Sequence, residues 1–289
     1  MRRLLLIDGG GSRGILAAHL ARLIEERAQA RLAGLVDIIG GAGTGAILAT
    51  ALALGFSAKT GEEFYAQEGD RIFKPRFVNS ILRGHPLRNL FRDRFNPSGL
   101  DLALRGLFEL RSFASCKPQA VVSTCQRGSG FELLDSSEIG PAVLARDVVT
   151  AACQVMFGSD AGAQSSPSLV AVSSLKKYCG DEFRVISIGT GQEYNPRTTR
   201  WLGEGLLGNA LRIVPMLAAG YLNNGERIYA MASGGSVIRL QPKLCYFSPA
   251  RDDGSSSAFR SLLMSADQYW RSLKLAELDV FFCRGHRAD

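Results

Sequence analysis

The sequence predicts one α/β domain built on a mainly parallel β-sheet. A pattern of strand, glycine turn and helix occurs twice between residues 4 and 54, which is typical of parallel α/β sheets. The apolar run at residues 4–7 shows no alternation with polar residues, which indicates a strand buried on both faces. The chain of 289 residues is long enough for one large buried core, and no internal repeat or clear linker divides it.

The first unit begins with a strand at residues 4–8, which ends at Asp8 and is followed by a glycine turn. Its basic start gives it a faint likeness to a signal peptide, but the apolar part is too short, so we expect a buried strand. A helix is expected over residues 15–27, because apolar residues recur there at helical spacing and charged residues occupy the other face.

The second unit is expected to comprise a strand at residues 35–39, a turn at 40–45 and a helix of small residues at 46–54. Residues 62–110 are predicted to be mostly helical, with breaks at Pro75, Pro86 and Pro97. The remaining predicted elements are strands at 119–124 and 183–188, helices at 146–155, 205–221 and 258–274, a polar loop at 159–167 and a surface loop at 252–257.

Composition and charge indicate a folded globular protein with an anionic partner. Hydrophobic residues make up 46% of the chain, as in folded globular proteins, and no apolar run reaches the roughly 20 residues of a membrane-spanning helix. The net charge of +7 favours an anionic partner, and because no nucleic-acid-binding module is present, we expect an anionic lipid surface and no nucleic acid. The cysteines lack metal-ligand spacing and are interpreted as free thiols; we expect no metal and no cofactor.

Two glycine-rich turns carry the candidate chemistry. The first, at residues 9–14, contains a GxGxxG, which also occurs in dinucleotide-binding folds. That interpretation requires an acidic residue after the second strand, where this chain has residues 40–45 and no acid. Acyl transfer fits better, because one turn offers backbone amides to an oxyanion and the other forms an elbow that presents a nucleophile.

At this point the sequence resembles the patatin-like phospholipases. Asp8 to Gly14 reads DGGGSRG, like that family's DGGGxRG, and the elbow and its small-residue helix follow at the usual distance. The late strand that ends in the GTG of residues 189–191 also looks like the family's. The resemblance implies a three-layer patatin-type fold with a mainly parallel central sheet flanked by helices. It covers residues 1–195, and residues 196–289 are expected to be a helical extension packed on the same domain.

The family uses a Ser–Asp dyad without histidine, so His19, His85 and His286 are interpreted as structural or exposed. The resemblance places Gly43 at the nucleophile position, where the serine is absent, and Asp160 as the candidate general base. Asp160 lies in Asp160-Ala161-Gly162, which differs from the family's DG[GA] motif. By the same resemblance, the oxyanion and binding residues are Gly9, Gly10, Gly11, Ser12, Arg13 and Gly14, and the elbow residues are Gly41, Thr44 and Gly45.

The resemblance leaves two functions open. One is a lipid acyl hydrolase that acts on membrane phospholipids or galactolipids, since some relatives with GxGxG in place of GxSxG are still classed as hydrolases. The other is a catalytically inactive relative that binds lipid or regulates an active enzyme. A nucleotide-binding protein is the less favoured third interpretation. For either lipid function we expect a cytoplasmic protein that binds membranes peripherally, helped by the Arg- and Phe-rich stretch at residues 71–95.

Overall fold

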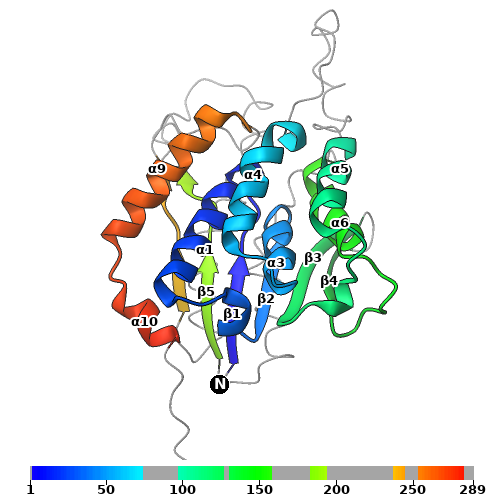
Figure 1. Cartoon of the computed structure of the whole chain (residues 1–289), viewed down its shortest axis with the longest axis horizontal. Helices are drawn as coiled ribbons and strands as arrows, with labels where there is room; N and C mark the ends of the chain where they lie inside the picture. The colour runs from blue at the N-terminus through cyan, green and yellow to red at the C-terminus, as the bar shows by residue number, and fades with distance from the viewer. Residues whose placement is uncertain are drawn as a thin grey trace, which may run out of the picture.

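The computed structural model describes residues 2–73, 97–126, 130–157, 183–193, 237–244 and 253–282. These residues form a mixed α/β structure around a six-stranded sheet with the order β4-β3-β2-β1-β5-β7 (Figure 1). Neighbouring strands run parallel except for β4, which is antiparallel to β3. The strands of this sheet are β1 (Arg2–Ile7), β2 (Ile38–Ala42), β3 (Gln119–Gln126), β4 (Gly130–Asp135), β5 (Phe183–Ile188) and β7 (Val237–Leu240). A small second sheet pairs β6 (Gln192–Glu193) with β8 (Lys243–Leu244).

Helices flank the sheet, and α1 contacts both α4 and α9. Figure 1 shows α1, α4 and α9 on one side of the sheet, with α9 beside α1. The helices are α1 (Gly14–Ala28), α2 (Leu32–Leu35), α3 (Gly45–Ala53), α4 (Ala58–Phe73), α5 (Pro97–Phe108), α6 (Ala145–Phe157), α9 (Ser256–Ser272) and α10 (Ala276–Phe282), with short 3-10 helices η1 (Gly11–Arg13) and η4 (Phe113–Ser115). No helix in the described ranges has both the length and the apolar character needed to cross a membrane.

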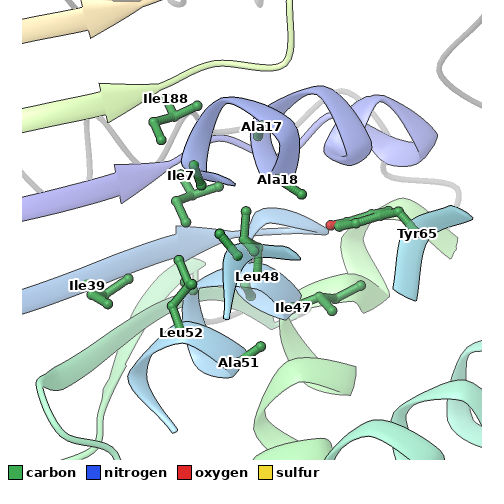
Figure 2. Close-up of a cluster of buried hydrophobic side chains, with 14 of the residues drawn as sticks. Ile7, Ala17, Ala18, Ile39, Ile47, Leu48, Ala51, Leu52, Tyr65 and Ile188 are labelled. Atoms are coloured by element: carbon green, nitrogen blue, oxygen red, sulfur yellow. The ribbon is translucent and has the colours of Figure 1, made fainter. Parts of the chain in front are cut away.

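The first strand is buried on both faces, which confirms the prediction from its unbroken apolar run. Leu5 and Ile7 join the large apolar cluster that includes α1 and α3, whereas Leu4 and Leu6 belong to a smaller cluster with Val185 of β5. Figure 2 shows part of the large cluster, with side chains from strands, from α1 and from α3 packed together. The sheet therefore separates two apolar layers, as an α/β domain requires.

The second strand begins later than predicted, at Ile38, because residues 32–35 form the short helix α2. The Glu25 carboxylate accepts the backbone N–H of Leu32 with one oxygen and that of Ala58 with the other, each at 2.9 Å. A single side chain therefore holds the first residues of both α2 and α4, where helical N–H groups lack backbone partners. Gly40 and Gly41 pair with β1 as strand residues, so the predicted turn is confined to Gly43 and Thr44.

The C-terminal part contributes more than helices. Helix α9 starts at Ser256, two residues before the predicted position, and the Ser255 hydroxyl caps it by accepting the amide of Ala258. Strand β7 extends the main sheet beside β5, and neither β7 nor the edge strand β4 was predicted from the sequence. The predicted helix at 205–221, the loop at 159–167 and the breaks at Pro75 and Pro86 lie outside the described residues.

Candidate active site

The first glycine turn connects β1 to α1 at the carboxyl edge of the sheet. The amide of Asp8 donates to Ile188 at the end of β5, which keeps the chain in line with the sheet up to the turn. A Cβ at Gly10 would lie 2.1 Å from the Thr190 hydroxyl oxygen, and one at Gly14 would lie 2.4 Å from the Tyr65 ring. Close packing from the turn after β5 and from α4 therefore restricts both positions to glycine.

The second turn connects β2 to α3 and has the shape of a strand–turn–helix elbow. Gly43 has a φ of +50°, a backbone conformation that residues with a side chain adopt only with strain. Among the residues that the structure describes, a Cβ at Gly43 would meet only the Cα of Gly9, at 3.8 Å, so these residues leave space beside Gly43. At Gly45, by contrast, a Cβ would lie 2.5 Å from the Ile7 carbonyl oxygen, so close packing requires glycine there.

Thr44 links the two turns. Its hydroxyl oxygen accepts the amide N–H of Gly10 at 3.2 Å and that of Gly11 at 3.0 Å. Its carbonyl oxygen accepts the Tyr65 hydroxyl at 2.7 Å, and Figure 2 shows the Tyr65 oxygen directed towards the turn after β2. The Gly10 and Gly11 amides, which the sequence analysis assigned to an oxyanion, thus donate to a side chain of the elbow.

Cys153 of α6 lies against the elbow, where its thiol contacts the Gly43 carbonyl oxygen at 3.4 Å. The side chain is fully buried, and burial raises the pKa of the Cys153 thiol to about 12. Because the thiolate is the nucleophilic form, this buried thiol is a poor nucleophile. Cys153 and Cys116 are both buried free thiols.

Asp8, the first residue of the DGGGSRG motif, is buried and forms an ion pair with Arg239 of β7. The same guanidinium group donates to the Ser187 hydroxyl at 2.6 Å and to the Gln241 side-chain oxygen at 3.0 Å. A buried charge needs such partners, because removing it from water is costly. Asp8 is therefore held by the sheet at the base of the glycine turn.

The structure brings most of the predicted site residues together at one edge of the sheet: Gly9, Gly10, Gly11, Ser12, Arg13 and Gly14 in one turn, and Gly41, Gly43, Thr44 and Gly45 in the other. Asp160, the candidate base, lies outside the described residues, as do His85 and His286. Asp135 is a buried carboxylate, but it binds Gln119 at the start of β3, at the opposite edge. In the described part of the chain, no group of three or more His, Cys, Asp or Glu side chains is arranged to hold a metal ion.

His19 is buried in α1, where its ring nitrogens lie 3.1 Å from the Glu62 carboxylate of α4 and 2.9 Å from the Asp267 carboxylate of α9. Burial opposes a charged ring, but the hydrogen bonds and negative charges of these two partners outweigh it and raise the pKa of His19. Its contacts connect three helices, which agrees with a structural role.

Tyr65 contacts the elbow and Arg239 contacts Asp8 at the base of the first glycine turn, but the sequence did not identify either residue. Neither lies in a recognisable motif, and nothing near them in the sequence indicates the residue that they contact.

The chain is similar to a known protein family and to individual known proteins. The family model described as patatin-like phospholipase matches residues 5–157, more than half of the chain. A curated relative, the cUMP-AMP-activated phospholipase of Escherichia coli, is 26% identical over 238 residues, which cover 73% of each chain.

Two bacterial proteins are among the solved structures that the chain matches. ExoU in complex with SpcU, from the type III secretion system of Pseudomonas aeruginosa, matches over 98% of this chain with a TM-score of 0.42 and 14% identity. The chain spans about half of ExoU, since the match covers 53% of that protein. VipD from Legionella pneumophila matches over 93% of this chain and 67% of its own, with a TM-score of 0.39 and 11% identity. The match to the family model, over the segment that holds both glycine turns, shows that the chain belongs to the patatin-like phospholipase family.

Proposed function

We propose that this protein is a lipid acyl hydrolase whose active site works without a serine nucleophile. The observation that carries the proposal is the elbow at Gly43, which has a positive φ and, among the described residues, only the Gly9 Cα near the position of a Cβ. An elbow of this kind presents one residue to the substrate above the carboxyl edge of the sheet. The family membership and the phospholipase among the relatives support a lipid ester as the substrate.

Without a serine, ester hydrolysis proceeds by direct attack of water on the acyl carbonyl carbon. A base takes one proton from the water, and the carbonyl oxygen becomes an oxyanion. The ester C–O bond then breaks as the oxyanion collapses, and the base returns the proton to the leaving oxygen, which gives a fatty acid and an alcohol. Asp160 remains our candidate for the base. Because Gly43 has no side chain, the described residues leave room for the attacking water where a serine oxygen would otherwise lie.

A second candidate function is a catalytically inactive relative that binds lipid or regulates an active enzyme. It is favoured by the contacts of Thr44, whose hydroxyl already accepts the amides of Gly10 and Gly11. A substrate oxyanion must displace this hydroxyl before it reaches those two donors. The glycine turn then serves to hold the elbow rather than to stabilise a transition state.

We further propose that the substrate is a phospholipid or galactolipid presented at an anionic membrane surface. The net charge of +7 supports this location, as does the Arg- and Phe-rich stretch at residues 71–95, most of which lies outside the described residues. Peripheral binding brings the carboxyl edge of the sheet to its substrate without a spanning helix.

The test is fatty-acid release from vesicles that contain phosphatidylglycerol and galactolipid, measured with and without pretreatment by a fluorophosphonate. An activated serine oxygen attacks the phosphorus of such a reagent and displaces fluoride, so release that continues after pretreatment supports the hydrolase without a serine nucleophile. Vesicle binding without release identifies the inactive relative instead. If the protein neither binds the vesicles nor releases fatty acid, the hydrolase and the lipid-binding form of the inactive relative are both wrong.

A further inference from the structure

Arg239 stands out because it joins the first motif of the chain to its C-terminal third. It pairs with Asp8, which is 231 residues earlier, and the two side chains are only 11% and 4% exposed. The segment that matches the family model ends at residue 157, so the partner of the motif's first residue lies beyond it. Neither the family match nor the sequence analysis assigned a role to this region.

The surroundings of Arg239 place its guanidinium group at the carboxyl edge of the sheet. Arg239 pairs in register with Ser187 of β5, and its side chain donates to the Ser187 hydroxyl. A Cβ at Gly189 would lie 1.4 Å from the Gln241 side-chain oxygen and 2.7 Å from Arg239 Nη2. The first glycine of the GTG turn therefore makes room for this network.

The same network reaches the glycine turn by a second route. Thr190 follows Gly189, and its hydroxyl donates to the Gly9 carbonyl oxygen at 3.4 Å. Asp8 immediately precedes Gly9, and its carboxylate is bound by Arg239. The Asp8 carboxylate is thus held by β7, and the Gly9 carbonyl oxygen is held by the turn after β5.

We propose that Arg239 is a positioning residue that sets the glycine turn through Asp8, so that the C-terminal third completes the candidate active site. A guanidinium group suits this role because its planar fork of donors serves three acceptors at once, which a lysine ammonium on a flexible stem does not reproduce. The effect on catalysis rests on the proposed function, whereas the effect on the conformation of the turn does not.

The experiment measures hydrogen exchange by mass spectrometry on the full chain, for peptides that contain Gly10 and Gly11 and for peptides from β3. In Arg239→Met we expect the two turn amides to exchange roughly tenfold faster or more, while the β3 amides keep their protection. In Arg239→Lys we expect the turn amides to exchange at a rate between those of the wild type and of Arg239→Met. The matched control is Arg184→Met, which removes an arginine of β5 that donates to the Val280 carbonyl oxygen instead, and leaves the turn unchanged.

A uniform increase of exchange in the turn and in β3 overturns the proposal, because Arg239 then supports only global stability. If Arg239→Met does not fold, the same comparison on Arg239→Lys decides between the two outcomes. Fatty-acid release gives a separate result: in a folded variant with a loosened turn we expect a lower kcat at unchanged KM. A wild type that releases no fatty acid refutes the proposed function, and the exchange data still decide the role of Arg239.

Discussion

The hydroxyl oxygen of Thr44 lies 3.0 Å from the amide nitrogen of Gly11, and this hydrogen bond joins the elbow to the glycine turn. The same oxygen accepts the amide of Gly10, and both contacts are buried. Tyr65 holds the backbone of Thr44 from the other side. One residue of the elbow therefore fixes the relative position of the two turns on which the candidate site depends.

Replacing Thr44 with valine removes this link with little change of shape. In Thr44→Val the buried amides of Gly10 and Gly11 lose their acceptor, and each unsatisfied group costs about 1–3 kcal/mol. We expect the free energy of unfolding, measured by urea denaturation, to fall by about 2 kcal/mol or more. Thr44→Ser keeps the hydroxyl and should restore most of the loss.

Thr50 provides a matched control within α3. Its side chain is fully buried, and its hydroxyl has no hydrogen-bond partner among the residues that the structure describes. Thr50→Val makes the same chemical change without removing an acceptor, so its effect should stay within about 1 kcal/mol and is expected to stabilise. Equal losses in Thr44→Val and Thr50→Val would show that the Thr44 hydroxyl contributes nothing specific.

Gly43→Ser tests the elbow directly. The described residues leave space for the new side chain, whereas the φ of +50° imposes strain of about 1–3 kcal/mol. If an aspartate base is in place, we expect the variant to become labelled by fluorophosphonate and to release fatty acid about 1,000-fold faster than the wild type, or more. Gel-based labelling and vesicle assays measure the two effects.

The control for this variant is Gly43→Ala, which carries the same backbone strain but no hydroxyl. It should match Gly43→Ser in thermal midpoint and remain unlabelled. A well-folded Gly43→Ser that is neither labelled nor active would favour the inactive relative over the hydrolase. Labelling of the wild type would contradict our assignment of the elbow, since another residue would then be the nucleophile.

His19 predicts a pH dependence of stability. Its pKa is raised by Glu62 and Asp267, against the effect of burial, so the folded state binds a proton more tightly than the unfolded state, whose pKa is about 6.5. The resulting stabilisation is complete below about 6.5 and is lost as the pH rises through the higher folded pKa, with a slope of at most about 1.4 kcal/mol per pH unit. Urea denaturation from about pH 6 to about pH 8.5 measures this loss.

His19→Gln should flatten the dependence in that range, and Asp267→Asn should reduce it, because one of the two carboxylates remains. Glu62 affects stability at acidic pH. Burial opposes its charge, but His19 and Arg22 outweigh burial and lower the pKa of Glu62. The stabilisation that Glu62 contributes is present above its unfolded pKa of about 4.5 and is lost as the pH falls through the lower folded pKa. An unchanged slope in His19→Gln would assign the effect to another group.

Membrane binding is predicted to be electrostatic and reversible. Each basic residue near an anionic surface contributes about 1 kcal/mol, and salt screens this attraction. We expect co-sedimentation with phosphatidylglycerol vesicles at low salt, weak binding to phosphatidylcholine vesicles, and release as salt increases. Equal binding to both kinds of vesicle, or binding that does not change with salt concentration, would contradict electrostatic membrane binding.

The stretch at residues 71–95 is tested by neutralising three of its arginines together, in the variant Arg88→Gln, Arg92→Gln and Arg94→Gln. A matched control removes the same charge from exposed positions on α5 and α9, in the variant Arg105→Gln, Arg260→Gln and Arg271→Gln. The first variant should lose more binding than the second. Equal losses would show that only the net charge of the chain matters.

Local patterns in the sequence were sufficient to predict β1, α1, α3, β3, α6 and β5, because buried strands and amphipathic helices leave periodic signals in adjacent residues. They failed for β4 and β7, which are the two edge strands of the main sheet. Val237–Leu240 is too short to show a period, and its place beside β5 depends on pairing with distant residues. The late start of β2 has a similar cause, since the Glu25 side chain stabilises the helical turn before it.

For the candidate site, the sequence alone located the two glycine-rich segments and predicted Gly43 at the nucleophile position, because motif spacing is local information. Only the tertiary structure decided what those turns contact: Thr44 on the Gly10 and Gly11 amides, Tyr65 against Gly14, and Arg239 on Asp8. Such contacts join residues that are far apart in the chain, and nothing in the neighbourhood of Asp8 specifies which of many arginines will neutralise it. The burial of that charge demands a partner, but the packing of β7 beside β5 selects which residue it is.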